Sequence, residues 1–174
     1  MYEKRVLSNI KDNVYDNLIE YLLETCNRVR FTNRTFGLKK EERKMLFETE
    51  KYIKENFLDD LIIKDREIED MLNYNNYDEY FRSYYIKVTP KLKKYLLSNK
   101  NIYAWLNPMY PEDMAFYKDN YCILQSITHE KLCFIYCERK EDFKKYEDMG
   151  IQFMKQYLFK EKSSLYIDSY KEPY

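Results

Sequence analysis

The feature of this chain that most constrains its fold is a series of three strand-like segments joined by short turns, over residues 114–137. Segments 114–118, 121–127 and 132–137 are rich in β-branched and aromatic residues, which favour an extended backbone. Asp119-Asn120 separates the first two segments, and both residue types tolerate the positive φ angles of a two-residue type I′ turn. The sequence therefore predicts an antiparallel meander.

The two turns also determine which residues of the meander face each other, because the register of a hairpin follows from its turn. The predicted partners across the first turn are Lys118 with Tyr121, Phe116 with Ile123, and Met114 with Gln125. The predicted partners across the second turn are Ile127 with Leu132, and Cys122 with Cys137.

This register brings two unusual segments to one end of the sheet. The first strand follows a Pro-Glu-Asp step, and a Thr-His-Glu step with the only histidine of the chain joins the second strand to the third. A segment with the only tryptophan leads into the same corner. We define the corner by Trp105, Pro108, Pro111, Glu112, Asp113, His129 and Glu130.

Three interpretations of the corner stay open. It is structural if Glu112 or Asp113 caps the turn amides and His129 donates to a nearby carbonyl. It is part of a partner-binding surface if its side chains contact another protein. It is chemical if Asp113, His129 and Glu130 transfer protons or bind a metal ion. Because one histidine cannot supply the two or three imidazoles of most such metal sites, we assign no catalytic residue, metal or cofactor.

Outside the meander, helical and extended patterns alternate. Apolar residues three and four positions apart predict helices over residues 11–26 and 38–57, with Met45, Leu46, Thr49, Ile53 and Phe57 on one stripe of the second. Residues 58–72 are ambiguous, with a short buried strand at 61–63 as one alternative. The other predicted elements are a loop or short edge strand at 28–31, a strand at 79–88, a helix from Thr89-Pro90 to about residue 98, a helix at 141–149 capped by Gly150, and a final helix at 151–159.

These elements predict an α+β fold in which N-terminal helices pack on a small antiparallel β-meander of about four strands, with a C-terminal helix. A chain of 174 residues suits a single domain over residues 1–174. Within it we expect a helical half (1–72), a hinge loop (73–78), a β-rich half (79–159) and a loose tail (160–174).

Composition excludes several classes of protein. The 30 basic and 30 acidic residues balance, which argues against a protein that mainly neutralises phosphates. Two glycines are too few for a glycine-rich phosphate loop. No apolar run approaches the roughly 18 residues that span a bilayer, and residues 1–13 lack the core of a signal peptide. We therefore expect a cytoplasmic protein without membrane contact, whose four cysteines are reduced.

A known family shares part of this pattern. Residues 105–117 follow Trp-x-x-Pro-x-x-Pro-Glu-Asp-x-x-Phe-Tyr, and His129-Glu130 comes downstream. With the strand and capped helix before it, this segment resembles a family of small uncharacterised proteins from low-GC Gram-positive bacteria and their mobile elements, some labelled sporulation proteins. The resemblance covers residues 84–138; it implies an α+β fold and assigns no activity.

A small, glycine-poor, charge-balanced chain with 20 tyrosines and no catalytic motif is typical of a protein-binding module, although the codon bias of an AT-rich genome also enriches tyrosine. Our leading hypothesis is a non-enzymatic cytosolic inhibitor or immunity-type protein that masks a partner protein. That partner is a toxin, if the chain is an antitoxin, or a host defence complex, if the chain is a phage or mobile-element anti-defence protein such as an anti-CRISPR. One alternative is a small enzyme or metal-binding protein that uses Asp113, His129 and Glu130. A second is an RNA-binding protein that uses Arg28, Arg30, Arg34, Lys39 and Lys40.

Overall fold

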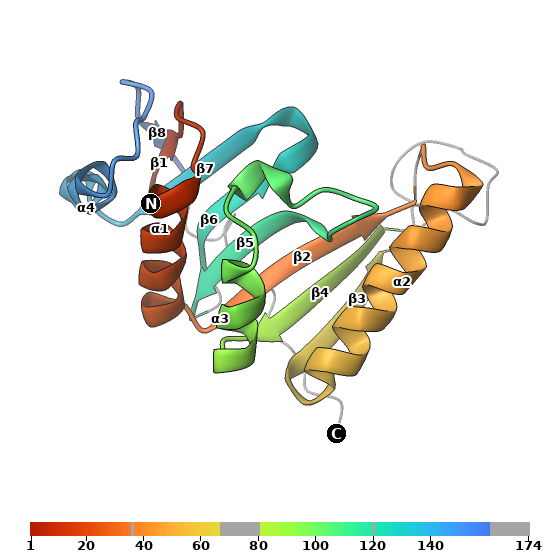
Figure 1. The fold of residues 1–174 in the computed structure, drawn as a ribbon. Helices are drawn as coiled ribbons and strands as arrows, with labels where there is room; N and C mark the ends of the chain where they lie inside the picture. Colours follow the sequence, from red (N-terminus) through yellow and green to blue (C-terminus); the bar gives the residue numbers. More distant parts are fainter. Residues whose placement is uncertain (36, 67–80, 120, 161–174) are drawn as a thin grey trace.

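The computed structural model describes residues 1–35, 37–66, 81–119 and 121–160. Within these residues, eight strands form one antiparallel sheet in the order β3-β4-β2-β5-β6-β7-β1-β8 (Figure 1). The strands are β1 (Tyr2–Arg5), β2 (Arg28–Arg34), β3 (Leu61–Arg66), β4 (Phe81–Lys87), β5 (Glu112–Lys118), β6 (Tyr121–Ile127), β7 (Leu132–Cys137) and β8 (Leu158–Phe159). The helices are α1 (Asp12–Thr25), α2 (Lys40–Phe57), α3 (Pro90–Leu97) and α4 (Lys144–Asp148), with short 3-10 turns η1 (Leu58–Asp60), η3 (Ile102–Ala104), η4 (Thr128–Glu130) and η5 (Lys140–Phe143).

Helices α1, α2 and α3 lie on the same face of the sheet (Figure 1). Each turns one apolar stripe towards the strands, with Leu18 and Leu22 buried on α1 and Ile53 and Phe57 buried on α2. These side chains join one hydrophobic core with residues of β2, β4, β5, β6 and β7. A smaller apolar cluster on the sheet contains Tyr85, Ala115, Tyr117, Cys122 and Tyr136. The α+β prediction is confirmed.

The predicted meander is present as β5, β6 and β7, with one change of register. Lys118 pairs with Tyr121 and Ile127 pairs with Leu132, as predicted. A β-bulge next to Phe116 shifts the rest of the first hairpin by one residue, so that Leu124 replaces Ile123 as the partner of Phe116, and Ala115 replaces Met114 as the partner of Gln125. All four cysteines are buried and free.

Two predicted helix ends are confirmed by their capping contacts. The Thr89 hydroxyl accepts a hydrogen bond from the Leu92 amide at 3.2 Å, and Pro90 occupies the first turn of α3. Gly150 ends α4 with a φ of 94°, and its amide donates to the Glu147 carbonyl at 2.9 Å. The Ile151 amide donates to the Tyr146 carbonyl at 3.1 Å, which completes a Schellman motif.

Other predictions are wrong or incomplete. Residues 28–31 are no loop or edge strand, because β2 runs to Arg34 and lies between β4 and β5. The final helix at 151–159 is absent from these described residues: Phe153 bridges to Val6, and Leu158–Phe159 pairs with β1. The estimate of about four strands was too low, because β1, β2 and β8 pair with segments distant in sequence.

The short strand at 61–63 is confirmed as part of β3. The hinge loop at 73–78 and residues 161–174 of the predicted tail lie outside the described residues. No helix in the described ranges is both long and apolar enough to cross a bilayer.

Candidate functional site

The predicted corner forms where β5 begins and where η4 joins β6 to β7. Asp113 Oδ1 accepts a hydrogen bond from the Thr128 amide at 2.8 Å, and the Asp113 amide donates to Thr128 Oγ1 at 3.3 Å. Asp113 holds a φ of 54°, a conformation that aspartate tolerates better than most residues. This reciprocal pair is the turn capping that the structural interpretation expects.

His129 lies at the exposed edge of the corner. Its Nδ1 is 3.8 Å from Asp113 Oδ1, and its Nε2 is 3.7 Å from Glu130 Oε1. Both distances exceed that of a hydrogen bond, and the His129 side chain is 31% exposed. The imidazole is therefore close to two carboxylates and can still rotate.

Glu112 is the buried member of the corner, with a side chain only 1% exposed. The Nε of Arg34 forms an ion pair with it that lacks hydrogen-bond geometry, and the backbone of Asn107 lies close enough to favour the ionised carboxylate. Burial raises the pKa of Glu112, and the positive charge of Arg34 opposes this rise.

The corner also brings together a possible set of metal ligands. One ligand atom each from Glu112, Asp113 and His129 lies within 4.8 Å of the others. The sequence interpretation had grouped Glu130 with Asp113 and His129. Glu130 contacts the outer side of the imidazole, so Glu112 is the second carboxylate of this set.

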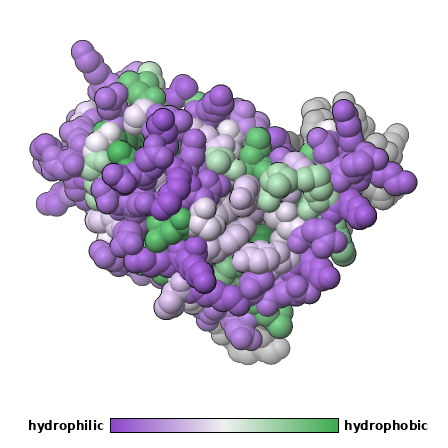
Figure 2. Space-filling view, in the orientation of Figure 1, coloured by the Kyte–Doolittle hydropathy of each residue, from purple (hydrophilic) through white to green (hydrophobic). Residues whose placement is uncertain are grey.

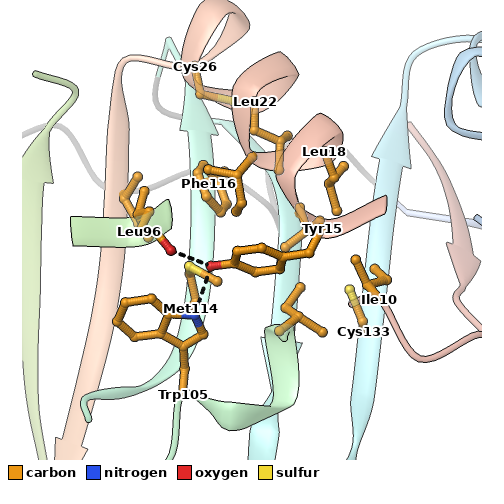
Figure 3. Packing of buried hydrophobic residues seen from close by; sticks show 14 of the residues in the cluster. Ile10, Tyr15, Leu18, Leu22, Cys26, Leu96, Trp105, Met114, Phe116 and Cys133 are labelled. Atoms are coloured by element: carbon orange, nitrogen blue, oxygen red, sulfur yellow. Dashed lines mark hydrogen bonds between the residues drawn. The ribbon is translucent and has the colours of Figure 1, made fainter. Parts of the chain in front are cut away.

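Trp105 and the two prolines of the corner have structural positions. Trp105 is fully buried, and its Nε1 donates to the hydroxyl of Tyr15 at 2.9 Å (Figure 3). That hydroxyl donates in turn to the carbonyl of Leu96 at 2.9 Å, which joins α1 to α3. Pro111 is buried, and Pro108 is half-buried after a cis peptide bond. Trp105 and Pro111 are therefore not exposed contact residues in this structure.

The predicted basic group is divided between different environments. Arg28, Arg30 and Arg34 alternate along β2 with Val29 and Phe31, which point into the core. The Nε of Arg30 is buried, and Arg34 pairs with Glu112. Lys39 and Lys40 are exposed where α2 begins. In the described structure, this division does not produce the continuous basic groove that tracks a nucleic-acid backbone.

A group of exposed apolar side chains was not predicted. Thr49 of α2 donates to the carbonyl of Pro108 at 2.9 Å, which holds the loop after η3 beside the helix. On either side of this contact lie four large side chains that we call the methionine patch: Met45 (41% exposed), Tyr52 (46%), Leu106 (40%) and Met109 (62%). Figure 2 shows light green and white residues on the face between α3 and α2.

The helix pattern gave a partial signal for this patch. The stripe predicted for residues 38–57 combined Met45 and Thr49 with truly buried positions. In the structure the buried positions are Leu46, Glu50, Ile53 and Phe57, so Met45 and Thr49 flank the stripe. A stricter 3.6-residue period would have separated the two groups.

The chain matches no protein-family model, and no curated protein or solved structure matches it significantly. The resemblance of residues 84–138 to the low-GC Gram-positive family stays a prediction.

Proposed function

We propose that this chain is a non-enzymatic protein-binding module that inhibits a partner protein by masking it, with the methionine patch as its contact surface. The observation that carries the proposal is the exposure of Met45, Tyr52, Leu106 and Met109, which flank the contact between Thr49 and Pro108 in the sequence. Together these side chains present roughly 400 Å² to solvent, within the size range of functional apolar patches on monomers.

The residue types support a protein partner. Methionine side chains are flexible and polarisable, so they adapt to the shape of another protein surface. Tyrosine and methionine are enriched at protein interfaces, where tyrosine adds rigid contact area. The patch also rests on a well-packed base, because the Tyr52 ring lies 5.5 Å from Tyr95, which in turn lies 5.2 Å from Trp105. Such a base limits the entropy lost on binding.

The expected partner therefore presents an apolar helix or loop that packs against α2 and the loop after η3. An antitoxin that covers a toxin acts in this way, and so does a phage or mobile-element protein that blocks a host defence complex, including an anti-CRISPR. Antitoxins and anti-defence proteins of this kind need a stable contact surface and no catalytic group. The exposed patch on a packed base supports a masking protein of this class.

The test is affinity capture from cells of the source organism with three forms of the protein. Met109→Lys places a charge in the patch, while Leu7→Lys is a matched control, because Leu7 is 61% exposed on another part of the chain. We expect one protein to be retained by the wild type and by Leu7→Lys, and lost with Met109→Lys.

The captured protein is then purified and titrated against all three forms, with its own activity as a second measurement. Met109→Lys should weaken binding at least tenfold and relieve the inhibition to the same extent. Equal affinity of the wild type and Met109→Lys would remove the patch from the proposal. Full activity of the partner in the saturated complex would remove the masking function.

A further inference from the structure

We propose that Glu112, Asp113 and His129 form a binding site for one divalent metal ion. The inference is independent of the methionine patch. It starts from the ligand atoms of these three side chains, which lie within 4.8 Å of one another. An imidazole with two carboxylates suits divalent cations such as Zn²⁺ and Mn²⁺, and water molecules would complete the coordination shell.

Asp113 and His129 each have a ligand atom available, whereas Glu112 is paired with Arg34 in this structure. The Asp113 Oδ1 is engaged by the Thr128 amide, which fixes the carboxylate and leaves Oδ2 for an ion. The imidazole of His129 has no hydrogen bond to any residue that the structure describes. One ion at about 2.0–2.2 Å from each ligand requires ligand atoms no more than about 4 Å apart. The three ligand atoms, which lie within 4.8 Å of one another, therefore need to move less than about 1 Å closer, and the partly exposed His129 has room to turn.

Glu112 provides the observation that distinguishes this site from an ordinary acidic cluster. Its side chain is 1% exposed, and its ion pair with Arg34 lacks hydrogen-bond geometry. A buried carboxylate held by one poorly aligned ion pair is costly, because burial disfavours its charged form. A metal ion between Glu112, Asp113 and His129 would satisfy it directly.

The local charge fits a divalent cation. Glu112, Asp113 and Glu130 carry three negative charges when ionised, Arg34 carries one positive charge, and neutral His129 adds none. The sum is therefore −2, which a divalent ion reduces to zero. Arg34 is 32% exposed and can turn towards solvent when an ion takes its place. We therefore expect Arg34 and the ion to compete for Glu112.

The experiment uses the fact that His129 is the only histidine of the chain. In ¹⁵N-labelled protein the imidazole nitrogens give a single set of NMR signals, and coordination of Zn²⁺ shifts the nitrogen that binds it. We expect these signals to change and saturate at one equivalent of Zn²⁺. Unchanged imidazole signals at millimolar Zn²⁺ would overturn the proposal.

Variants separate a built site from an exposed imidazole that binds zinc alone. Glu112→Gln and Asp113→Asn should each weaken Zn²⁺ binding at least tenfold, and Arg34→Gln should strengthen it several-fold because it removes the competing charge. Asp142→Asn is the control, since Asp142 lies beyond the opposite end of β7 and should leave the affinity unchanged.

Circular dichroism shows which variants fold. If Glu112→Gln fails to fold, the Zn²⁺ affinity of Arg34→Gln still tests the proposal, because the proposed site requires tighter Zn²⁺ binding in this variant than in the wild type. Affinity that is the same in the wild type, Glu112→Gln and Arg34→Gln would show that His129 acts alone and would refute the site.

Discussion

The hydrogen bonds of the Tyr15 hydroxyl predict a measurable loss of stability in Tyr15→Phe. This hydroxyl accepts from Trp105 Nε1 and donates to the Leu96 carbonyl, both at 2.9 Å, in the core between α1, α3 and the sheet (Figure 3). The substitution removes one oxygen atom and keeps the aromatic ring. Its effect therefore measures the two hydrogen bonds with little change in packing.

The expected magnitude follows from what each partner retains. The Trp105 indole N–H is buried and loses its hydrogen bond, which costs about 1–3 kcal/mol. The Leu96 carbonyl keeps a long contact from the Asn99 amide at 3.4 Å, so its loss adds about 0.5–1 kcal/mol. The sum is roughly 1.5–4 kcal/mol, or about 3–16 °C in melting temperature for a chain of this length.

Urea denaturation followed by the fluorescence of Trp105, the only tryptophan, measures this difference directly. Tyr52→Phe is the matched control, because it removes the same atom from a side chain that is 46% exposed. Tyr15→Phe should lower the unfolding midpoint with an unchanged slope, while Tyr52→Phe should change it by less than about 0.5 kcal/mol. Equal effects of the two substitutions would refute the assignment of Trp105 to a hydrogen-bonded core.

Three further predictions concern single residues. Burial raises the pKa of Glu112 above its ordinary value of 4.5, so the wild type should lose stability relative to Glu112→Gln as the pH rises from about 4 to 7. Urea denaturation at pH 4 and at pH 7 measures the difference in unfolding free energy between the two proteins, and a difference that does not change with pH would contradict the prediction. Burial also raises the pKa of Cys122 and of Cys137 to about 12, so a thiol reagent at pH 8 should modify them slowly until denaturant is added; rapid native labelling would disagree. Gly150→Ala should cost about 1–2 kcal/mol in a thermal melt, because φ is 94° there, and an unchanged melting temperature would remove the capping role.

The fold could be predicted where the signals were local. The bounds of β6 and β7, the pairing of Lys118 with Tyr121 and the cap of α3 at Thr89 all depend on residues close in sequence. The place of β1 could not be predicted, because four residues near the N-terminus pair with strands that come after residue 131. A short strand has too few residues to show a clear hydrophobic period, and no neighbouring residue in the sequence indicates which distant strand it pairs with.

The candidate site shows the same division. The contact between Asp113 and Thr128 followed from the hairpin register, which tolerated the β-bulge because Asp113 and Thr128 lie at the strand ends. The ion pair between Arg34 and Glu112 could not be predicted in this way, because it depends on the pairing of β2 with β5. These two strands are separated by α2, β3, β4 and α3 in the chain. The burial of Trp105 also depends on tertiary packing, which a count of unusual residues does not reveal.

The position of β1 between β7 and β8 has a consequence for synthesis on the ribosome. Residues Tyr2–Arg5 are synthesised before strands β2 to β8, yet their partners in β7 begin only at Leu132. At roughly 5–20 residues per second, about 6–25 s pass between the synthesis of β1 and that of β7. During this time α1 also lacks much of the sheet against which it packs in the folded protein. The β5–β6–β7 meander has its partners close at hand and should form first. During this interval the nascent chain carries an unpaired β1 and an uncovered apolar face of α1, and a chaperone at the exit tunnel would have its largest effect on yield.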